Sequence, residues 1–381
     1  MTRALVPVAP DPEAVLIALR AALDGSGPAV RIAADVRPSD AVVPQRVAVV
    51  VETSGSSGPP KRVALATSAL LTSASATLAE LGGPGRWLLC LPTHYVAGVQ
   101  VLVRSLAAEA DPVVLPPGGF DAAAFLELAR SMPEGERRYS SLVPVQLARL
   151  LDRAEGDPAE AATLRSFDAL LIGGQATPQP LRDRAAALGV RIRLTYGSSE
   201  TAGGCVYDGL PLRDVRIRID DGQVLLGGPT LAEGYLDAGG ALDHDRTSAS
   251  FTTIEGERWY RTGDSGEIVD GRLQVTGRLD RVIVSGGEKV SLDVLERVLR
   301  ESIAPDAVVV RRADEQWGEV PVVVTAEAPC ELSAVRALAV ERLGRAAGPA
   351  AVLVVPEIPL LASGKPDRRA LERLAAGTDA H

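Results

Sequence analysis

The chain has 381 residues, of which 46% are hydrophobic and only 3% are aromatic, and its formal net charge is −9. This length favours two domains, and the composition predicts a sizeable core built mainly from alanine, valine and leucine. The acidic balance argues against a nucleic-acid-binding protein, because such proteins need a basic face. It does not argue against nucleotide binding, since backbone amides and a few cations suffice for phosphate groups.

Cysteine and histidine usage narrows the class further. Cys90, Cys205 and Cys330 are scattered without a Cys-x-x-Cys pair, which indicates a reducing compartment and neither a disulfide framework nor a zinc site. The histidines are too widely spaced to form a local metal cluster. No apolar run is long enough for a signal peptide or a membrane span. We therefore expect a soluble, cytoplasmic protein.

The first half of the chain alternates helical and strand-like patterns. A helix is expected over 11–24, with Pro12 near its start, and a β-branched strand over 46–51 leads into a Gly/Ser loop. Strands that alternate with helices indicate an α/β domain with a mainly parallel sheet. The remaining expected strands are 87–91, 112–115, 169–172 and 190–194, and the expected helices are 67–81, 98–108, 121–131, 143–154 and 178–188.

The pattern changes after about residue 205. Shorter alternating segments such as 215–219 and 223–226, separated by glycine-rich turns, predict an antiparallel β-rich subdomain. Residues 239–258 are polar and weakly patterned, and we expect a surface loop there.

A new series of strand and helix patterns begins after Asp280. Ser291 is placed to cap a helix, and strand and helix patterns follow it, which predicts a second, α+β domain. The predicted domains are therefore 1–279 and 280–381. The further elements expected in the second domain are strands over 308–310 and 320–325 and a helix over 332–347.

The loop from Thr53 to Lys61 is rich in glycine and hydroxyl groups and follows a strand. Glycines let backbone amides approach phosphate oxygens, hydroxyls add donors, and Lys61 adds charge. The spacing is not that of a Walker A loop. Alone, the segment is as compatible with a surface linker as with a phosphate cradle, and its position after a strand favours the cradle.

Four later motifs supply the other charged groups. Glu200, in Tyr-Gly-Ser-Ser-Glu, is a carboxylate suited to Mg²⁺. Asp264 is placed to accept hydrogen bonds from ribose hydroxyls, and Arg278 to add a second contact. Lys365 follows a glycine in a polar loop. Taken singly, Glu200 and Asp264 are also compatible with ordinary turns and Arg278 with a surface arginine. A single lysine such as Lys365 would, without the other motifs, be interpreted as solvated.

In combination and in this order, the motifs resemble those of the acyl/aryl adenylate-forming superfamily, the AMP-binding acyl-CoA synthetases and their relatives. The resemblance implies a large α/β domain with a parallel sheet and a β-rich subdomain, followed by a small mobile α+β domain. It implies Lys365, Glu200 and Arg278 as catalytic residues, with Glu200 the Mg²⁺ ligand. The ATP- or AMP-binding residues that it implies are Thr53, Ser54, Gly55, Ser56, Ser57, Gly58, Lys61, Gly173, Gly174, Gln175, Tyr196, Gly197, Ser198, Ser199 and Asp264.

The resemblance also implies two half-reactions at one site. ATP first converts a carboxylate to an acyl-adenylate, and the thiol of CoA then attacks that intermediate. Asp280 would be the hinge about which the small domain rotates between the two steps. The rotation would withdraw Lys365 and bring Ser285, Gly286 and Gly287 to the tunnel that admits CoA.

Within the superfamily, the chain is similar to the actinobacterial 2-succinylbenzoate–CoA ligases of menaquinone biosynthesis. Segments that carry this similarity include 86–92, 101–105, 138–142 and 203–209. The segment 91–98 stands where the amino-acid-activating members of the superfamily have an aspartate that binds the substrate amine. No aspartate is present here, which disfavours an amino acid as the substrate.

That substrate has a second carboxylate, and Arg104 is the candidate cation for it; a solvated helix-face arginine is an equal alternative. The sequence leaves open whether His94 or Tyr95 lines the tunnel and whether the chain forms a homodimer.

Two rival functions use the same residues. One is an enzyme that loads an acyl group onto the thiol of a carrier protein. The other is a nucleotide-binding regulator without catalysis, which the presence of Glu200, Asp264, Arg278 and Lys365 together disfavours.

Overall fold

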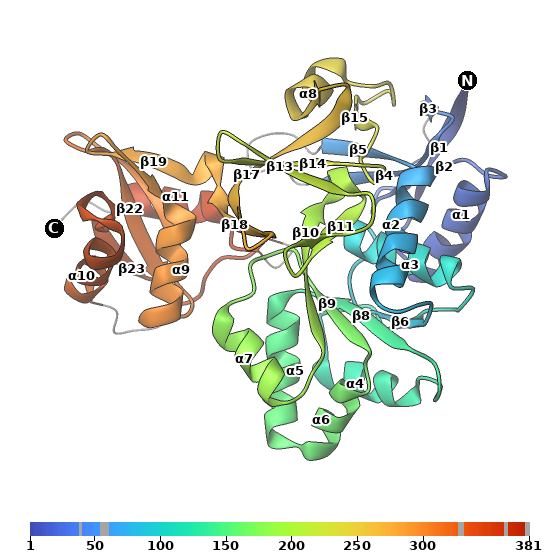
Figure 1. Cartoon of the computed structure of the whole chain (residues 1–381), viewed down its shortest axis with the longest axis horizontal. Helices are drawn as coiled ribbons and strands as arrows, with labels where there is room; N and C mark the ends of the chain where they lie inside the picture. Colours follow the sequence, from blue (N-terminus) through green and yellow to red (C-terminus); the bar gives the residue numbers. More distant parts are fainter. Residues whose placement is uncertain (38–39, 54–60, 327–330, 362–364, 378–381) are drawn as a thin grey trace.

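The computed structural model describes the chain except for residues 38–39, 54–60, 327–330, 362–364 and 378–381. Figure 1 shows two lobes: a large one, coloured blue to yellow, and a small C-terminal one in orange and red. None of the helices in the described part of the chain combines the length and apolar character needed to cross a membrane.

The first sheet of the large lobe consists of β1 (Thr2–Val8), β2 (Ala29–Ile32), β3 (Val42–Pro44), β4 (Val47–Thr53), β5 (Lys61–Ala66) and β15 (Gly234–Leu236). Its strand order is β15-β5-β4-β2-β1-β3. The first five residues of β4 are buried valines and one alanine, as expected for a β-branched strand in the interior of a sheet. Strand β4 pairs in parallel with β2 and antiparallel with β5, so the sheet is mixed.

The second sheet consists of β6 (Arg86–Leu89), β7 (Val113–Val114), β8 (Arg138–Leu142), β9 (Ala169–Ile172), β10 (Ile192–Ser198), β11 (Gly203–Tyr207) and β12 (Leu210–Pro211). Strands β6 to β10 pair in parallel, which confirms the predicted parallel sheet, and β11 adds antiparallel to β10. The ends of β9 and β10 lead directly into the segments around Gly173 and Glu200.

Helices connect and cover the strands, as the alternating pattern predicts. The Asp11 side chain caps α1 by accepting from the Ala14 amide at 2.9 Å, and Pro12 occupies the first turn. Trp87 and Tyr139 are fully buried between sheet and helices. The helices of the large lobe are α1 (Pro12–Asp24), α2 (Thr67–Glu80), α3 (Val96–Ala107), α4 (Ala122–Ser131), α5 (Pro144–Gly156), α6 (Pro158–Arg165) and α7 (Gln179–Ala187).

An antiparallel sheet follows, as predicted for the β-rich region. Its strands are β13 (Arg216–Asp220), β14 (Gln223–Gly227), β16 (Phe251–Ile254), β17 (Glu257–Val269) and β18 (Arg272–Arg278). Strand β17 pairs with both β14 and β18, and this pairing sets Asp264 opposite Arg278.

The expectation of a surface loop over 239–258 is wrong. The segment contains α8 (His244–Ser250) and β16. The Asp243 side chain caps α8 by accepting from the Arg246 amide at 2.9 Å, and the buried Phe251 anchors β16 against the ring of Tyr260. Few apolar residues mark this segment, so tertiary packing around one phenylalanine decides its structure.

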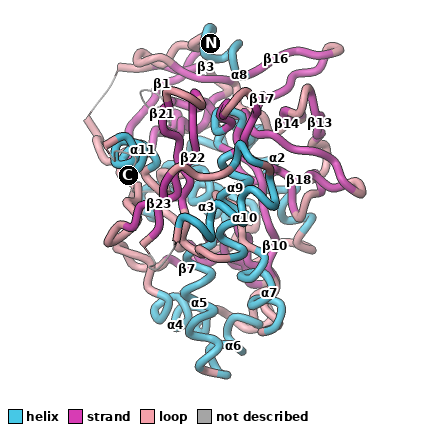
Figure 2. Tube along the Cα trace, turned by 90° about the vertical axis from the view of Figure 1, so that its left-hand side faces the viewer, coloured by secondary structure: helices cyan, strands magenta, loops and turns pink. Residues whose placement is uncertain are grey.

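The small lobe contains η2 (Leu279–Arg281), β19 (Val282–Ser285), β20 (Glu288–Ser291), α9 (Leu292–Ser302), β21 (Val308–Asp314), β22 (Gly318–Thr325), α10 (Leu332–Leu343), η3 (Arg345–Ala347), β23 (Ala351–Val354) and α11 (Arg368–Ala376). Valines alternate between the two faces of its sheet. Val309 and Val323 pack with α9 and α10, whereas Val308 and Val310 pack with Leu371 of α11. Figure 2 shows β21, β22 and β23 of this sheet from the side.

The predicted helix over 332–347 is too long. Helix α10 ends at Leu343 because Gly344 adopts a φ of 90°, a conformation that glycine reaches without strain. A separate 3₁₀ turn, η3, follows.

Candidate active site at the junction of the two lobes

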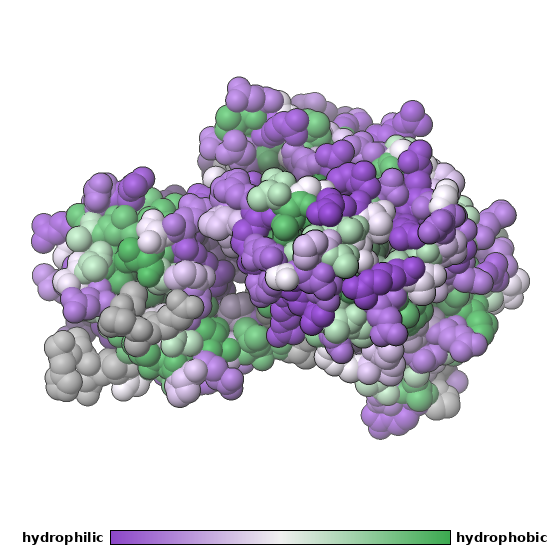
Figure 3. Space-filling model, turned by 90° about the horizontal axis from the view of Figure 1, so that it is seen from below, coloured by the Kyte–Doolittle hydropathy of each residue, from purple (hydrophilic) through white to green (hydrophobic). Residues whose placement is uncertain are grey.

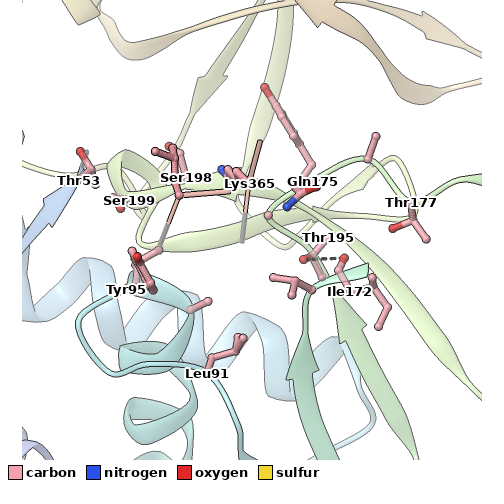
Figure 4. Close-up of a pocket in the computed structure, with 18 of the residues that line it drawn as sticks. Thr53, Leu91, Tyr95, Ile172, Gln175, Thr177, Thr195, Ser198, Ser199 and Lys365 are labelled. Carbon is pink, nitrogen blue, oxygen red and sulfur yellow. Dashed lines mark hydrogen bonds between the residues drawn. The ribbon is translucent and has the colours of Figure 1, made fainter. Parts of the chain in front are cut away.

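A cavity of about 3330 Å³ lies where the two lobes meet, and Figure 3 shows the hollow between them. Residues of both lobes line it. The sequence-predicted site residues among its described lining are Thr53, Lys61, His94, Tyr95, Gly174, Gln175, Tyr196, Gly197, Ser198, Ser199, Glu200, Asp264, Arg278, Asp280 and Lys365. Figure 4 shows Lys365 in the pocket with Gln175, Ser198 and Ser199, and with Tyr95 and Leu91 on the opposite wall in that view. One cavity therefore gathers residues separated by more than 300 positions.

The candidate phosphate loop connects two paired strands. Thr53 ends β4, Lys61 begins β5, and the two residues are register partners across the hairpin. Both line the cavity, so the ends of the loop open into it. Ser54, Gly55, Ser56, Ser57 and Gly58 lie outside the described residues. The Lys61 ammonium lies over the ring of Tyr235, 5.2 Å from its centroid.

Glu200 lies in the short turn η1 (Ser199–Thr201) that follows β10. Its residue is only 6% exposed, and its Oε1 accepts a hydrogen bond of 2.8 Å from the hydroxyl of the fully buried Tyr235. Burial raises the pKa of Tyr235, and the Glu200 charge raises it further, so the phenol keeps its proton and remains a donor. Tyr235 was not predicted as a site residue, because an aromatic residue between Gly234 and Leu236 is typical of a core strand.

Asp264 lies at the centre of a second polar group. Its Oδ2 accepts a 2.5 Å hydrogen bond from the hydroxyl of Tyr196, and its Oδ1 accepts one of 3.0 Å from Arg278 Nη1. Burial raises the pKa of the Asp264 carboxyl, and the two hydrogen bonds only partly oppose that shift. Arg278 also contacts Asp280 at 3.2 Å, so one guanidinium joins the Asp264 carboxylate to the predicted hinge residue.

Lys365 reaches the cavity from the small lobe. Its carbonyl accepts from the Leu361 amide at 2.8 Å, and Leu360 pairs antiparallel with Pro366. We call these two paired segments, 359–361 and 365–367, the lysine hairpin. Partial burial lowers the pKa of the Lys365 ammonium and the Arg278 charge lowers it further, while Asp264 acts in the opposite direction. The structure therefore places Lys365 near the Asp264–Arg278 pair.

Two glycines shape the wall beside the end of β9. A Cβ on Gly173 would lie 2.4 Å from Thr195 Oγ1, which itself donates to the Ile172 carbonyl at 3.2 Å (Figure 4). Gly174 adopts a φ of 80° and turns the chain so that Gln175 lines the cavity. Gly173 supports this turn but is not among the described residues that line the cavity.

His94 and Tyr95 lie together, with ring centroids 4.2 Å apart, and both line the cavity. Burial lowers the pKa of His94 and raises that of Tyr95, so both rings favour their neutral forms. The geometry does not single out one of them as the residue of a tunnel.

Arg104 is neither solvated nor among the described residues that line the cavity. It is 3% exposed and lies over the Trp87 ring, 5.0 Å from the centroid. Its Nε has no hydrogen-bond partner within the described part of the chain. Burial lowers its pKa, which the neighbouring Tyr207 partly opposes. The alternative of a solvated surface arginine is therefore wrong.

Ser285, Gly286 and Gly287 form the turn between β19 and β20 and are not part of the described cavity lining. Gly286 and Gly287 have φ values of 57° and 86°, and the Gly286 amide donates to the Trp317 carbonyl at 2.9 Å. The structure does not bring this turn to the cavity.

A family model for AMP-binding enzymes matches residues 5–236, and the chain belongs to the AMP-binding enzyme family. The chain is 42% identical over 341 residues to the probable 2-succinylbenzoate–CoA ligase of Mycobacterium tuberculosis (strain CDC 1551 / Oshkosh). That match covers 87% of this chain and 85% of the relative.

Two solved structures of the o-succinylbenzoate CoA synthetase (MenE) from Bacillus subtilis have the same fold. The complex with the acyl-adenylate intermediate OSB-AMP has a TM-score of 0.75 at 24% identity, over 94% of this chain and 81% of that one. The complex with ATP and magnesium ion has a TM-score of 0.72 at 23% identity, over 95% and 82%. At these identities the likeness shows the fold alone.

Proposed function

We propose that the chain is an ATP-dependent acid–thiol ligase that converts 2-succinylbenzoate to 2-succinylbenzoyl-CoA through an acyl-adenylate, a step of menaquinone biosynthesis. The observation that supports it most is the cavity that gathers Lys365, Glu200, Asp264 and Arg278 in one place. The extensive match to a relative named as this ligase supports the choice of acid and thiol.

In the first half-reaction, a carboxylate oxygen of the acid attacks the α-phosphorus of ATP, and the bond from that phosphorus to the bridging oxygen breaks. Pyrophosphate leaves and the acyl-adenylate remains. Two anions must approach each other, so cations that meet the developing charge accelerate the step. Lys365 is the candidate for this role. We propose that Asp264 and Arg278 hold the ribose and that Tyr196 and Gln175 flank the adenine, which is supported by their place in the same cavity lining.

The residues around Glu200 fit a magnesium ion. Mg²⁺ in nucleotide sites is held by one or two carboxylates together with substrate phosphates. Glu200 offers one such carboxylate in the cavity, bound to Tyr235, whose ring lies under the Lys61 ammonium. No cluster of three or more potential ligands occurs among the described residues. Bound Mg²⁺ would neutralise phosphate charge; Tyr235 would orient the carboxylate that receives it.

In the second half-reaction, the thiol of CoA attacks the carbonyl of the adenylate, the thioester bond forms, and AMP leaves. We propose that the small lobe rotates about Asp280, with domains 1–279 and 280–381, and carries the 285–287 turn toward the cavity. Support comes from the apolar cores, which divide between Val275 and Ile283. Because Lys365 and that turn both belong to the small lobe, one rotation would move both.

Arg104 remains the candidate for the second carboxylate of the acid. It is a buried cation whose Nε lacks a hydrogen bond within the described residues, and such groups gain most from an anionic partner. Since Arg104 is not among the described residues that line the cavity, the cavity would have to extend to it, or a water would have to bridge to the carboxylate.

Of the two rival functions, the first shares the adenylation step and the second lacks it. A carrier-protein-loading enzyme would make the same adenylate and use a different thiol. A non-catalytic regulator would bind ATP without releasing pyrophosphate.

The experiment is pyrophosphate release from ATP and Mg²⁺ with a panel of carboxylates headed by 2-succinylbenzoate, with and without CoA. We expect sustained turnover with 2-succinylbenzoate only when CoA is present. Turnover with another acid would change the assigned substrate but keep the mechanism. Dependence on a carrier protein would favour the carrier-protein-loading enzyme. Folded protein that binds ATP yet releases no pyrophosphate with any acid would contradict the proposal.

A further inference from the structure

A buried carboxylate in the small lobe binds three arginines from three different segments. Glu296 of α9 is 7% exposed, and its Oε2 accepts from the Val309 amide at 3.0 Å. Arg368 binds both of its oxygens, through Nη1 at 2.7 Å and Nη2 at 3.0 Å. Arg300 approaches to 3.2 Å and Arg281 to 3.5 Å. The Glu296 carboxylate is therefore a junction between parts of the chain that are distant in sequence.

The Arg368 end of this junction leads to Lys365. Arg368 is the first residue of α11 and stands three positions after the lysine. Between them, the Asp367 amide donates to the Pro359 carbonyl at 2.7 Å, and the Lys365 carbonyl accepts from the Leu361 amide. The bond from Arg368 to Glu296 thus attaches the end of the lysine hairpin to α9, three residues after Lys365, which lines the cavity.

The Arg281 end leads to the hinge. Arg281 follows Asp280 directly, and its Nε lies 2.5 Å from Asp293 Oδ1, one turn before Glu296 on the same face of α9. Its Nη2 also donates to the Val309 carbonyl at 2.8 Å. The carboxylates of α9 therefore bind the first residues after the hinge on one side and the lysine hairpin on the other.

We propose that Arg368 is a positioning residue for Lys365, and that its two-pronged bond to Glu296 sets where the lysine ammonium enters the cavity. The hinge residue Arg281 and the hairpin residue Arg368 share one carboxylate, so the lysine keeps a fixed place relative to the hinge when the small lobe closes. This inference rests on the proposed function, because it assigns Lys365 to the adenylation half-reaction.

The charges of Glu296 and its arginine partners stabilise this junction, and they allow one arginine to be replaced without leaving a buried carboxylate unpaired. Burial alone would raise the pKa of Glu296, but the hydrogen bonds and charges of its arginine partners outweigh burial and lower it. Three arginines, Arg281, Arg300 and Arg368, face two carboxylates, Asp293 and Glu296. Loss of Arg368 leaves two of each, so no carboxylate is left without a cation, which is the costly outcome in a buried site.

Position matters more than charge for the reaction. A displacement of about 1 Å at a reacting group costs on the order of 100-fold in rate. Without Arg368, α11 still packs through the buried Leu371, but the segment that follows Lys365 loses its two side-chain hydrogen bonds to Glu296. The adenylation step should therefore slow while the lobe stays folded.

The test compares Arg368→Gln with the matched variant Arg300→Gln in the full-length protein. Both variants remove one guanidinium from Glu296, and both arginines line the cavity, but Arg300 lies on α9 itself whereas Arg368 stands three residues after Lys365. We measure single-turnover pyrophosphate release with 2-succinylbenzoate and no CoA, and separately the transfer to CoA of chemically prepared acyl-adenylate. We expect Arg368→Gln to slow the first step about 10- to 100-fold and leave the second within about twofold, and Arg300→Gln to leave both near wild type.

Arg368→Lys provides a second variant that keeps the charge and loses only the two-pronged geometry, and we expect an intermediate loss in the first step. Equal losses in both half-reactions, equal effects of the Arg300 and Arg368 variants, or an unchanged first step would overturn the proposal. Failure of the proposed function itself is distinguishable, because the wild-type protein would then release no pyrophosphate with any acid.

Discussion

Tyr235 joins two groups that the sequence treats as independent. Its ring lies under the Lys61 ammonium, and its hydroxyl binds the Glu200 carboxylate. The hydroxyl and the carboxylate belong to residues 35 positions apart, and neither the strand pattern around Tyr235 nor the turn around Glu200 indicates the contact. Only the pairing of β15 with β5 places the phenol there.

Replacement of Tyr235 by phenylalanine should weaken the response to magnesium. The ring stays and the hydrogen bond is lost, so the Glu200 carboxylate is held less firmly. We expect the Mg²⁺ concentration for half-maximal pyrophosphate release to rise about tenfold, with a smaller change in KM for the acid. Magnesium-dependent thermal stabilisation of the ATP complex gives a second readout.

The matched control is Tyr139→Phe, which removes a phenol that donates to the Leu81 and Gly83 carbonyls away from the cavity. It should lower stability without changing the Mg²⁺ requirement. The same Mg²⁺ response in both variants would show that Tyr235 contributes packing alone.

The lowered pKa of Lys365 sets a pH limit on the reaction. The ammonium acts as a cation, and a pKa below the ordinary lysine value means that the charge is lost at a lower pH as the pH rises. The pH dependence of kcat/KM for ATP reports the ionisable groups of the free enzyme. We expect kcat/KM to decrease at alkaline pH, with an apparent pKa below the ordinary lysine value of about 10.4. Lys365→Arg should be slower but should lose this fall, because arginine stays charged. An identical alkaline limb in both proteins would assign the limb to another group.

At the scale of elements, the predicted order of strands and helices is confirmed in the α/β region, because apolar periodicity there is strong. The region 239–258 was predicted wrongly because one residue, Phe251, determines its packing. Its ring contacts those of Tyr235 and Tyr260, and the Arg258 guanidinium lies 4.2 Å from its centroid. These partners are invisible to a local pattern, and so is the bond between Arg368 and Glu296, which spans 72 positions.

Phe251→Ala should destabilise the β-rich sheet by about 3 kcal/mol, the lower end of the usual cost of removing a buried phenylalanine ring. Urea unfolding followed by tryptophan fluorescence checks this, since Trp259 is the register partner of the neighbouring Thr252. Thr253→Ala, an exposed change on the same strand, should alter the free energy of unfolding by less than about 0.5 kcal/mol. Similar losses in the two variants would show that Phe251 does not anchor β16.

At the scale of the whole molecule, the sequence motifs predict which residues meet, and the structure adds how they meet. Fifteen of the predicted residues line one cavity, although Thr53 and Lys365 lie at opposite ends of the chain. The position of the 285–287 turn outside this lining follows from the arrangement of the two lobes, which local patterns do not encode. The same is true of Arg104, whose burial against the Trp87 ring depends on the packing of α3 against β6.

The most direct test of the account follows an oxygen atom. 2-Succinylbenzoate labelled with ¹⁸O in its carboxylates is incubated with ATP, Mg²⁺, CoA and the protein, and the products are analysed by mass spectrometry. If a carboxylate oxygen attacks the α-phosphorus, one ¹⁸O appears in AMP for each thioester formed, and pyrophosphate carries none. Label in inorganic phosphate, with ADP as the product, or thioester formation without label in AMP, would contradict adenylation as the chemistry of this cavity.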